Sequence, residues 1–514
     1  MTANVSESTA KTAGRGGIAI AVAKISFVLL GFIQQLIFPR VLDEAGYGSV
    51  SRMLAVVSIV NNVVVATSLQ GVSRMVAAAA EGADEIAFRQ TLRIHAVLAL
   101  FVSTTFALLA GTIADWIEAP HAATPLRIAA GVVLCYGVYA PLVGALNGRR
   151  RFVTQAGLDI FYGVSRTIAM TVAAWAFAHI LHLDGAIGAA TGFVAAALLI
   201  VPIAVSRTGI GKAATNARDA KPSASEYLKF LLPLIVAQAG LNLLLQTDLL
   251  LLSEAAGEHA RTTGLDAKEA DKLLAPYRAV QLFGFLPYQL LMSVQFVLFP
   301  LLAKASAENK PHEVTAFTRQ GMRLAFVLTG AIAGTIAALG PHVLRFAFPD
   351  SIAAGGAPFV RMYVLGLSSL SILGVASAAL VSLRKERWSV MLTWITVAAI
   401  AGAIVLTRPS GAFGGLLLFT TARASAIGMV LSAIVAAVLV RRAAGGFAPP
   451  LAIVRVGIAT AVVMGLGFVM PFMGKLLVPV QAGALVLVYF GVLIATGEVG
   501  KGDLALVKKV LGRS

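Results

Sequence analysis

Apolar stretches of about twenty residues recur along the whole chain, and they constrain its fold more than any other feature. A helix of that length crosses about 30 Å of hydrocarbon. Only helices and closed barrels satisfy their backbone hydrogen bonds in a membrane, and these stretches lack the alternation of a barrel strand. Residues of the set AVILMFWYC make up 58% of the chain and charged residues only 13%, too apolar for a water-soluble surface. The sequence therefore predicts an all-α membrane protein with about fourteen transmembrane helices.

The expected spans have boundaries that are approximate by a few residues. They are 17–39, 51–70, 95–115, 127–146, 155–178, 185–205, 230–252, 279–302, 324–340, 357–381, 388–407, 413–440, 451–471 and 476–496. The first stretch lacks a small-residue cleavage pattern and is followed at once by a second span. We therefore expect it to be an anchor rather than a removed signal peptide.

Positive charge is distributed unevenly over the connections. Of the 41 Lys and Arg residues, 27 fall at the termini and in the even-numbered connections, whereas 11 fall in the odd-numbered ones. Cytoplasmic loops carry the excess of basic residues in membrane proteins. This pattern predicts a multi-pass membrane protein with both termini in the cytoplasm. The net charge of +17 then has a topological use, and no nucleic acid is expected as a partner.

Two blocks of six spans flank a basic cytoplasmic connection. We expect an N-lobe at residues 1–206, a linker at 207–229, a C-lobe at 230–442, and two further helices with a cytoplasmic tail at 443–514. The basic connection 149–151, between spans four and five, recurs as 384–387 between spans ten and eleven. An even number of spans per block preserves orientation. The two lobes are therefore expected to be parallel repeats around a central cavity.

Basic residues within spans, or at their ends, are the candidate binding residues. Charged side chains are costly in hydrocarbon and usually face a cavity, although those at span ends can instead extend to the interface. A cavity richer in cations than in anions favours an anionic cargo, and guanidinium groups suit phosphate or pyrophosphate. The expected substrate-binding residues are Lys24, Arg52, Arg166, Arg278 and Arg423.

Neutral polar residues at helical spacing mark faces that either contact a partner helix or line the cavity. The expected cavity-lining residues are Gln35, Asn62, Gln238, Asn242, Gln246 and Gln281. Asp248 is the chief acid expected within a span, and it would either pair with a cation or sense a coupling ion. His179 and His182 are spaced like a metal pair but have no further ligands nearby, so neither a metal nor a cofactor is expected.

The segments 31–42, 46–48 and 69–74 together resemble the opening helical pair of polysaccharide flippases in the multidrug/oligosaccharidyl-lipid/polysaccharide exporter (MOP) superfamily. The likeness extends over nearly the whole chain through the paired lobes, the basic connections and the two terminal helices. It implies a protein of the bacterial cytoplasmic (inner) membrane that transfers undecaprenyl-pyrophosphate-linked oligosaccharide repeat units across that membrane by alternating access. The product would be lipopolysaccharide, exopolysaccharide or another surface polysaccharide. The implied partners are that lipid-linked glycan, the lipid bilayer, and polysaccharide polymerase or ligase machinery.

Three alternatives stay open. The chain is also similar to lipid II flippases of the superfamily, but these typically carry an Arg-Asp pair in the first helix, where Gln34 and Gln35 stand here. A cation-coupled drug exporter would favour an acidic cavity. A polytopic polymerase or ligase usually needs a sizeable outer loop, and the largest one here, roughly 253–276, is small. The chain has no G-x-x-x-x-G-K-[ST] phosphate loop, and we expect a transporter rather than an enzyme.

Overall fold

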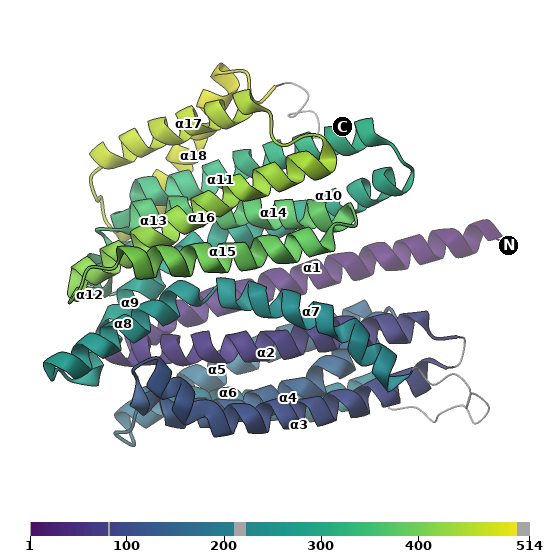
Figure 1. The fold of residues 1–514 in the computed structure, drawn as a ribbon, viewed down its shortest axis with the longest axis horizontal. Helices are drawn as coiled ribbons and strands as arrows, with labels where there is room; N and C mark the ends of the chain where they lie inside the picture. The colour runs from purple at the N-terminus through teal and green to yellow at the C-terminus, as the bar shows by residue number, and fades with distance from the viewer. Residues whose placement is uncertain (1, 81–82, 210–222, 501–514) are drawn as a thin grey trace. The chain divides into compact units, whose positions relative to one another are not determined.

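The computed structural model describes residues 2–80, 83–209 and 223–500, which form long helices joined by short connections (Figure 1). The chain divides into two compact units, Met1–Ala275 and Pro276–Ser514. We call them unit 1 and unit 2 and describe each by itself. The all-α membrane fold predicted from the sequence is confirmed.

Unit 1 contains the helices of the amino-terminal half. They are α1 (Thr2–Val41), α2 (Glu44–Ala78), α3 (Asp84–Trp116), the short η1 (Pro120–Ala122), α4 (Ala123–Gly148), α5 (Phe152–His179), α6 (Gly185–Thr208), α7 (Ala224–Leu244), α8 (Thr247–Thr263) and the first half of α9 (Ala267–Gly284). Within it, α4 packs against α2, α3 and α6, and α5 packs against α1 and α6. The helix α4 is therefore the centre of this unit.

Unit 2 contains the rest of the chain. After the end of α9 come α10 (Leu286–Ala307), α11 (Pro311–Ala347), α12 (Asp350–Gly356), α13 (Val360–Leu367), α14 (Ser369–Ser382), α15 (Glu386–Thr407), α16 (Gly414–Ala444), α17 (Pro450–Val469), the short η3 (Lys475–Leu477) and α18 (Val478–Ala495). The long α11 contacts most of the others. On one side it packs against α17 and α18, where the Tyr489 hydroxyl donates to the carbonyl of Val327.

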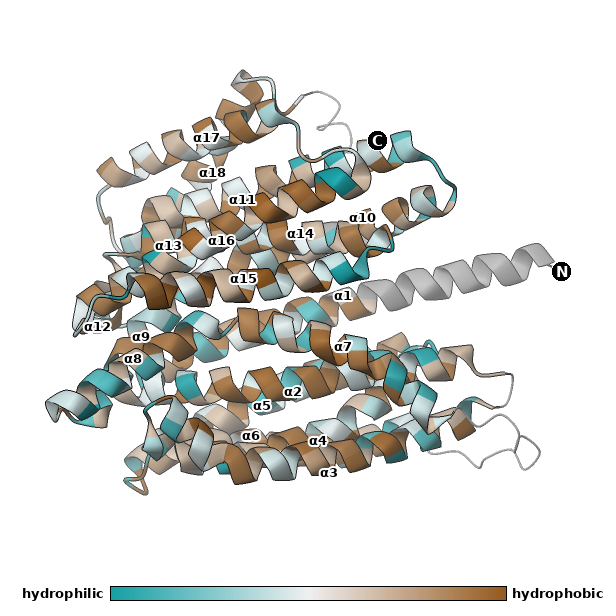
Figure 2. Cartoon of the chain, in the orientation of Figure 1, coloured by the Kyte–Doolittle hydropathy of each residue, from teal (hydrophilic) through white to brown (hydrophobic). Residues whose placement is uncertain are grey.

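Thirteen helices in the described residues are long and apolar enough to cross a membrane, and Figure 2 shows apolar residues recurring along them. They correspond to the expected spans in order, with one difference. The expected eighth span, 279–302, falls on the end of α9 and on α10, which is not among these thirteen. The chain is thus a multi-pass membrane protein.

The two basic connections that suggested an internal repeat share their backbone geometry. Arg150 after α4 and Arg384 after α14 have φ angles of 58° and 56°. The next residue in each turn donates its amide hydrogen five residues back, Arg151 to Leu146 at 2.8 Å and Lys385 to Leu380 at 2.9 Å. A residue in the left-handed region followed by such a bond is a common helix ending. The recurrence therefore extends from residue type to conformation.

The lobe boundaries expected from the sequence stay a prediction. The expected linker, 207–229, lies between α6 and α7, and its residues 210–222 fall outside the described residues. The compact units divide later, after Ala275, because α7 packs against α2. A side-chain hydrogen bond joins these two helices, from Asn62 Nδ2 to Asn242 Oδ1 at 2.9 Å.

Candidate functional site

Two of the cations expected to bind substrate lie at the packing face between α1 and α5 in unit 1. Lys24 is on α1 and interacts electrostatically with Asp159 on α5. Arg166, seven residues after Asp159, lies on the same face of α5 because seven residues make two helical turns. Its guanidinium carbon is 4.7 Å from the ring centre of Phe27, three residues after Lys24. We call Lys24, Asp159 and Arg166 the α1–α5 charge cluster.

Small residues let the two helices approach each other here. A Cβ atom added to Gly163 would lie 3.0 Å from Leu30, and one added to Gly31 would lie 3.7 Å from Arg166 Nη2. The guanidinium therefore occupies space that a larger residue at position 31 would narrow. Close backbone approach at small residues is a usual way for membrane helices to pack.

Arg166 is held by aromatic rings rather than by an acid. Its guanidinium carbon also lies 5.9 Å from the ring centre of Phe193 on α6. Within the described residues it forms no ion pair, and its buried Nε atom has no hydrogen-bond partner. Cation–π contacts stabilise a guanidinium but leave its charge uncompensated. The side chain is half-buried, so an anion could reach it.

Three tyrosines form the neighbouring wall. Tyr136 and Tyr139 on α4 and Tyr162 on α5 are buried, with ring centres 5.1 to 6.1 Å apart. The Tyr139 hydroxyl donates to Asp159 Oδ1 over 3.2 Å. Asp159 is half-buried and Lys24 is exposed along α1, so the cluster is open on one side. It combines two cations, one acid and phenolic hydroxyls, a set that can hold a phosphate and balance its charge.

Sequence reasoning missed Asp159 and the tyrosines. The available signal was the spacing of Asp159 and Arg166, which places an acid and a base two turns apart within one expected span. Asp248, the acid singled out instead, is buried in the first turn of α8 and accepts from the Leu249 amide at 2.8 Å. Its role in ion coupling stays a prediction.

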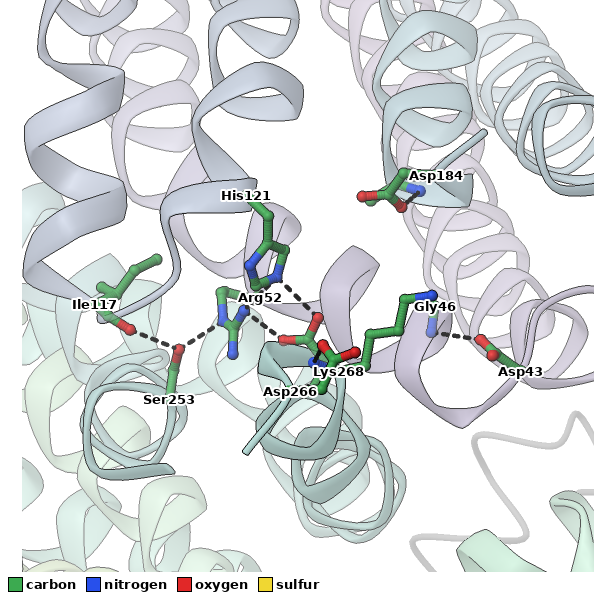
Figure 3. A network of polar contacts seen from close by, with 11 residues as sticks. Asp43, Gly46, Arg52, Ile117, His121, Asp184, Ser253, Asp266 and Lys268 are labelled. Carbon is green, nitrogen blue, oxygen red and sulfur yellow. Dashed lines mark hydrogen bonds and ion pairs between the residues drawn. The ribbon is translucent and has the colours of Figure 1, made fainter. Parts of the chain in front are cut away.

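Arg52 lies elsewhere in unit 1, at the ends of the helices (Figure 3). It is 1% exposed and forms an ion pair with Asp271 of α9. Its Nε donates to Ser253 Oγ at 2.6 Å, and its Nη1 lies 3.2 Å from His121 Nε2. His121 Nε2 is also 2.9 Å from Asp271 Oδ2. Arg52 is therefore engaged in a buried network that joins α2, α8, α9 and η1.

A pocket of about 650 Å³ opens beside this network. Three of its acids are held by their own helix starts or turns: Asp43 accepts from Gly46 N, Asp184 from Ala186 N and Asp266 from Lys268 N. The rest of its polar lining includes His121, His179, His182, Lys268 and Asp271. Figure 3 shows the carboxylates around this space. The described residues include no group of three His, Cys, Asp or Glu that could hold a metal ion.

The remaining candidate cations belong to unit 2. Arg278 Nη1 donates to Gln281 Oε1 at 2.6 Å, and Gln281 is fully buried. Arg423 is exposed on α16. The structure thus brings Lys24 and Arg166 to one place, whereas Arg52 lies in a separate network of the same unit. Substrate binding by these residues stays a prediction.

The expected cavity-lining amides form contacts between and within helices. Gln35 Oε1 accepts from the Tyr47 hydroxyl at 3.1 Å. Asn62 and Asn242 bond to each other as described above, and Asn242 Nδ2 also donates to the Gln238 carbonyl at 2.8 Å. Gln246 is buried, with no hydrogen-bond partner for its Oε1 atom. Their part in lining a transport cavity stays a prediction.

The model of a family described as "Polysaccharide biosynthesis protein" matches residues 13–306, more than half of the chain. The chain belongs to this family. The matched region contains the whole α1–α5 charge cluster and the Arg52 network. No curated protein matches the chain.

Solved structures of transporters share the fold of this polysaccharide biosynthesis protein. It is similar to the lipid II flippase MurJ in an inward closed conformation, with a TM-score of 0.70 and 12% identity over 92% of this chain and 98% of that one. It is similar to an inward-facing multidrug resistance MATE family transporter of the MOP superfamily, with a TM-score of 0.65 and 16% identity over 82% of this chain and 97% of that one. The chain is also similar to an outward-facing MATE transporter, with a TM-score of 0.60 and 15% identity over 84% of this chain and 95% of that one. The polysaccharide family that the sequence resembles and a fold shared with solved flippases and transporters are thus confirmed.

Proposed function

We propose that this chain is a flippase that moves undecaprenyl-pyrophosphate-linked oligosaccharide repeat units across the bacterial cytoplasmic membrane, by alternating access, for cell-surface polysaccharide biosynthesis. It acts as a transporter rather than an enzyme, with both termini in the cytoplasm. The polysaccharide biosynthesis family and the flippase-type fold support the transport of a lipid-linked glycan. The excess of basic residues at the termini and in the even-numbered connections supports the orientation. The resemblance of the sequence to polysaccharide flippases supports the lipid-linked oligosaccharide as the substrate.

The observation that carries the proposal is the state of Arg166. A guanidinium within a membrane span normally has an acidic partner, since an unpaired charge in hydrocarbon costs several kcal/mol. Arg166 has aromatic rings around it and no carboxylate in contact within the described residues. A pyrophosphate would supply the missing negative charge through charge-assisted hydrogen bonds.

Asp159 complements this role. It balances Lys24 while the site is empty, and an arriving pyrophosphate would compete with it for the ammonium group. Such exchange allows the pyrophosphate to bind and to be released, because Asp159 pairs with the Lys24 ammonium group again when the lipid leaves. The acid–base pair therefore favours a substrate that is both anionic and released.

A lipid II-type cargo is the nearest alternative, given the likeness to MurJ. Here the two first-helix positions are amides that make contacts inside unit 1: Gln34 Nε2 lies 3.0 Å from Met170 Sδ, and Gln35 accepts from Tyr47. Both are buried. They offer no charged pair to a substrate, which favours the polysaccharide repeat unit over lipid II.

The test is extraction of undecaprenyl-linked lipids from a deletion strain, with mass spectrometry and a leaflet-accessibility assay for the glycan. Build-up of a lipid-linked repeat unit on the inner leaflet supports the proposal and identifies the cargo. Build-up on the outer leaflet would place the protein downstream as a polymerase or ligase. Unchanged lipid-linked glycans would favour a drug exporter.

Complementation of that strain tests the site. Arg166→Gln should leave the lipid on the inner leaflet, while Arg127→Gln, which removes an exposed arginine of α4 in the same unit, should restore transport. Both proteins must reach the membrane in equal amounts. Full transport by Arg166→Gln would show that the cation at this position does not bind the cargo.

A further inference from the structure

A second group of basic and aromatic residues lies at one end of unit 2. His342 and Arg345 are near the end of α11, and Arg361 is in the first turn of α13. Phe468 is near the end of α17, and Phe472 is in the connection that follows it. The guanidinium carbon of Arg361 is 3.8 Å from the Phe468 ring centre, and that of Arg345 is 5.7 Å from the Phe472 ring centre. We call these five residues the α11–α17 basic cluster.

The cluster is held in place by packing on both sides. A Cβ atom added to Gly340 of α11 would lie 3.2 Å from Arg361 Cγ, so the stem of this arginine runs close along α11. The buried side chain of Gln481 on α18 donates to the Pro471 carbonyl at 2.9 Å. That bond fixes the connection that carries Phe472. Arg361 and the connection that carries Phe472 are therefore positioned by the fold.

The positive charge of the cluster is uncompensated. His342 interacts electrostatically with both Arg345 and Arg361. Within the described residues neither arginine forms an ion pair. Arg361 Nε and His342 Nδ1 are buried and have no hydrogen-bond partner. Buried polar groups are normally satisfied, and Arg361 Nε carries a hydrogen, so this atom indicates a missing acceptor.

The α11–α17 basic cluster lies at the ends of membrane spans, which gives its depth in the bilayer. Candidate spans end at Ala347 and Val469, and another begins at Val360. Arg345, Arg361 and Phe468 each lie within two residues of such an end. Span ends meet the lipid head groups. Phe468 is 62% exposed and would lie against lipid rather than protein.

We propose that the α11–α17 basic cluster binds the phosphate group of a membrane lipid. The two guanidinium groups donate hydrogen bonds to the phosphate oxygens, and the phenylalanine rings contact the glycerol end of the chains. This site is separate from the α1–α5 charge cluster and does not depend on the cargo. Arginines that merely extend to the interface would show no preference for a phosphate and would need no fixed rings.

Native mass spectrometry of the purified full-length chain tests the proposal. The delipidated protein is titrated with dioleoylphosphatidylglycerol, with dioleoylglycerol, which lacks the phosphate, and with inorganic phosphate. We expect phosphatidylglycerol to bind, and Arg345→Gln/Arg361→Gln to weaken that binding about tenfold or more. The matched variant Arg441→Gln/Arg442→Gln removes the same charge from the end of α16 and should bind like the wild type.

Equal binding of dioleoylglycerol, or equal loss in both double variants, would overturn the proposal. Binding of inorganic phosphate without any binding of phosphatidylglycerol would also overturn it, since the ligand of the cluster would then be a soluble anion rather than a lipid. If the double variant does not fold, Arg361→Lys provides the test, because it keeps the charge but loses the planar fork. We then expect weaker binding of phosphatidylglycerol with unchanged binding of dioleoylglycerol, and unchanged phosphatidylglycerol binding would count against the site.

Discussion

The hydroxyl of Tyr139 on α4 donates a hydrogen bond to Asp159 Oδ1 on α5, with the two oxygens 3.2 Å apart. Lys24 on α1 interacts electrostatically with the same carboxylate. Asp159 on α5 therefore connects to two other helices. It contacts α4 through a neutral hydrogen bond and α1 through an electrostatic interaction. Because these two contacts can be removed separately, their contributions can be measured separately.

Asp159→Asn should make ligand-free protein less stable and more responsive to an anion. The asparagine still accepts from Tyr139 but no longer balances the charge of Lys24. Undecaprenyl pyrophosphate would restore the balance. Thermal unfolding of the detergent-solubilised protein should show a lower midpoint without ligand and a larger ligand-induced rise than in the wild type.

Tyr139→Phe is the matched control, since it removes the hydrogen bond and keeps both charges. Its ligand-induced rise should equal that of the wild type. An equal rise in all three proteins would contradict the role of charge balance in binding.

The buried Arg52–Asp271 ion pair should be needed for stability. Arg52→Met leaves the carboxylate of Asp271 without its cation in the interior of unit 1. Breaking a buried pair in this way costs about 3–5 kcal/mol, whereas replacing both partners by apolar residues is often close to neutral. Arg52→Met should therefore unfold at a lower denaturant concentration, and Arg52→Met/Asp271→Leu should recover most of the loss.

Arg261→Gln is the surface control for this experiment. Arg261 is exposed, and its Nε atom lies 2.8 Å from Glu118 Oε2. Ion pairs of exposed side chains add little to stability. We expect no measurable change. A stable Arg52→Met protein that had lost only transport would instead favour a direct role of Arg52 in substrate binding.

The membrane spans could be predicted from the sequence because hydropathy is a local property, and the cost of charge in hydrocarbon likewise singled out Lys24 and Arg166. Partners could not be predicted in the same way. Arg52 pairs with Asp271, which is 219 residues away in the sequence, and Asn62 bonds to Asn242, which is 180 residues away. Such pairs are set by which helices become neighbours, which a single sequence does not encode locally.

Residues that matter at tight helix contacts were also hidden in the sequence, because glycine is frequent throughout this chain. A Cβ atom at Gly192 of α6 would lie 2.2 Å from the Ala169 carbonyl oxygen of α5. Gly192→Ala should therefore push the two helices apart and cost about 1–3 kcal/mol. Thermal unfolding and membrane yield measure the loss.

Gly157→Ala on α5 is the matched change, since nothing lies within 4 Å of its added Cβ. We expect it to be neutral or slightly stabilising, because alanine is the better helix former. Equal losses in both variants would mean that the α5–α6 contact tolerates the methyl group.

The turn between α10 and α11 should loosen in acid. Lys310 Nζ lies 2.8 Å from Glu308 Oε2, and this hydrogen bond and its charge lower the pKa of Glu308 below its ordinary value of 4.5. A carboxyl group with a lowered pKa contributes stability that is present above its unfolded-state pKa and is lost as the pH falls through the folded-state pKa. Amide hydrogen exchange at residues 308–310 should therefore increase, relative to the neighbouring helices, only below about pH 4.5.

Lys310→Gln removes the cation and should return the pKa of Glu308 towards its ordinary value. The acid-induced increase in exchange at residues 308–310 should then become smaller, because a carboxyl group with nearly the same pKa in the folded and unfolded states contributes no stability that acid can remove. Lys304→Gln is the matched change, because Lys304 Nζ is 3.9 Å from Glu308 Oε1 and forms the weaker contact. It should reduce the acid-induced increase less. An equal reduction in both variants would show that the overall positive charge of the connection, rather than the Glu308–Lys310 hydrogen bond, sets the pKa.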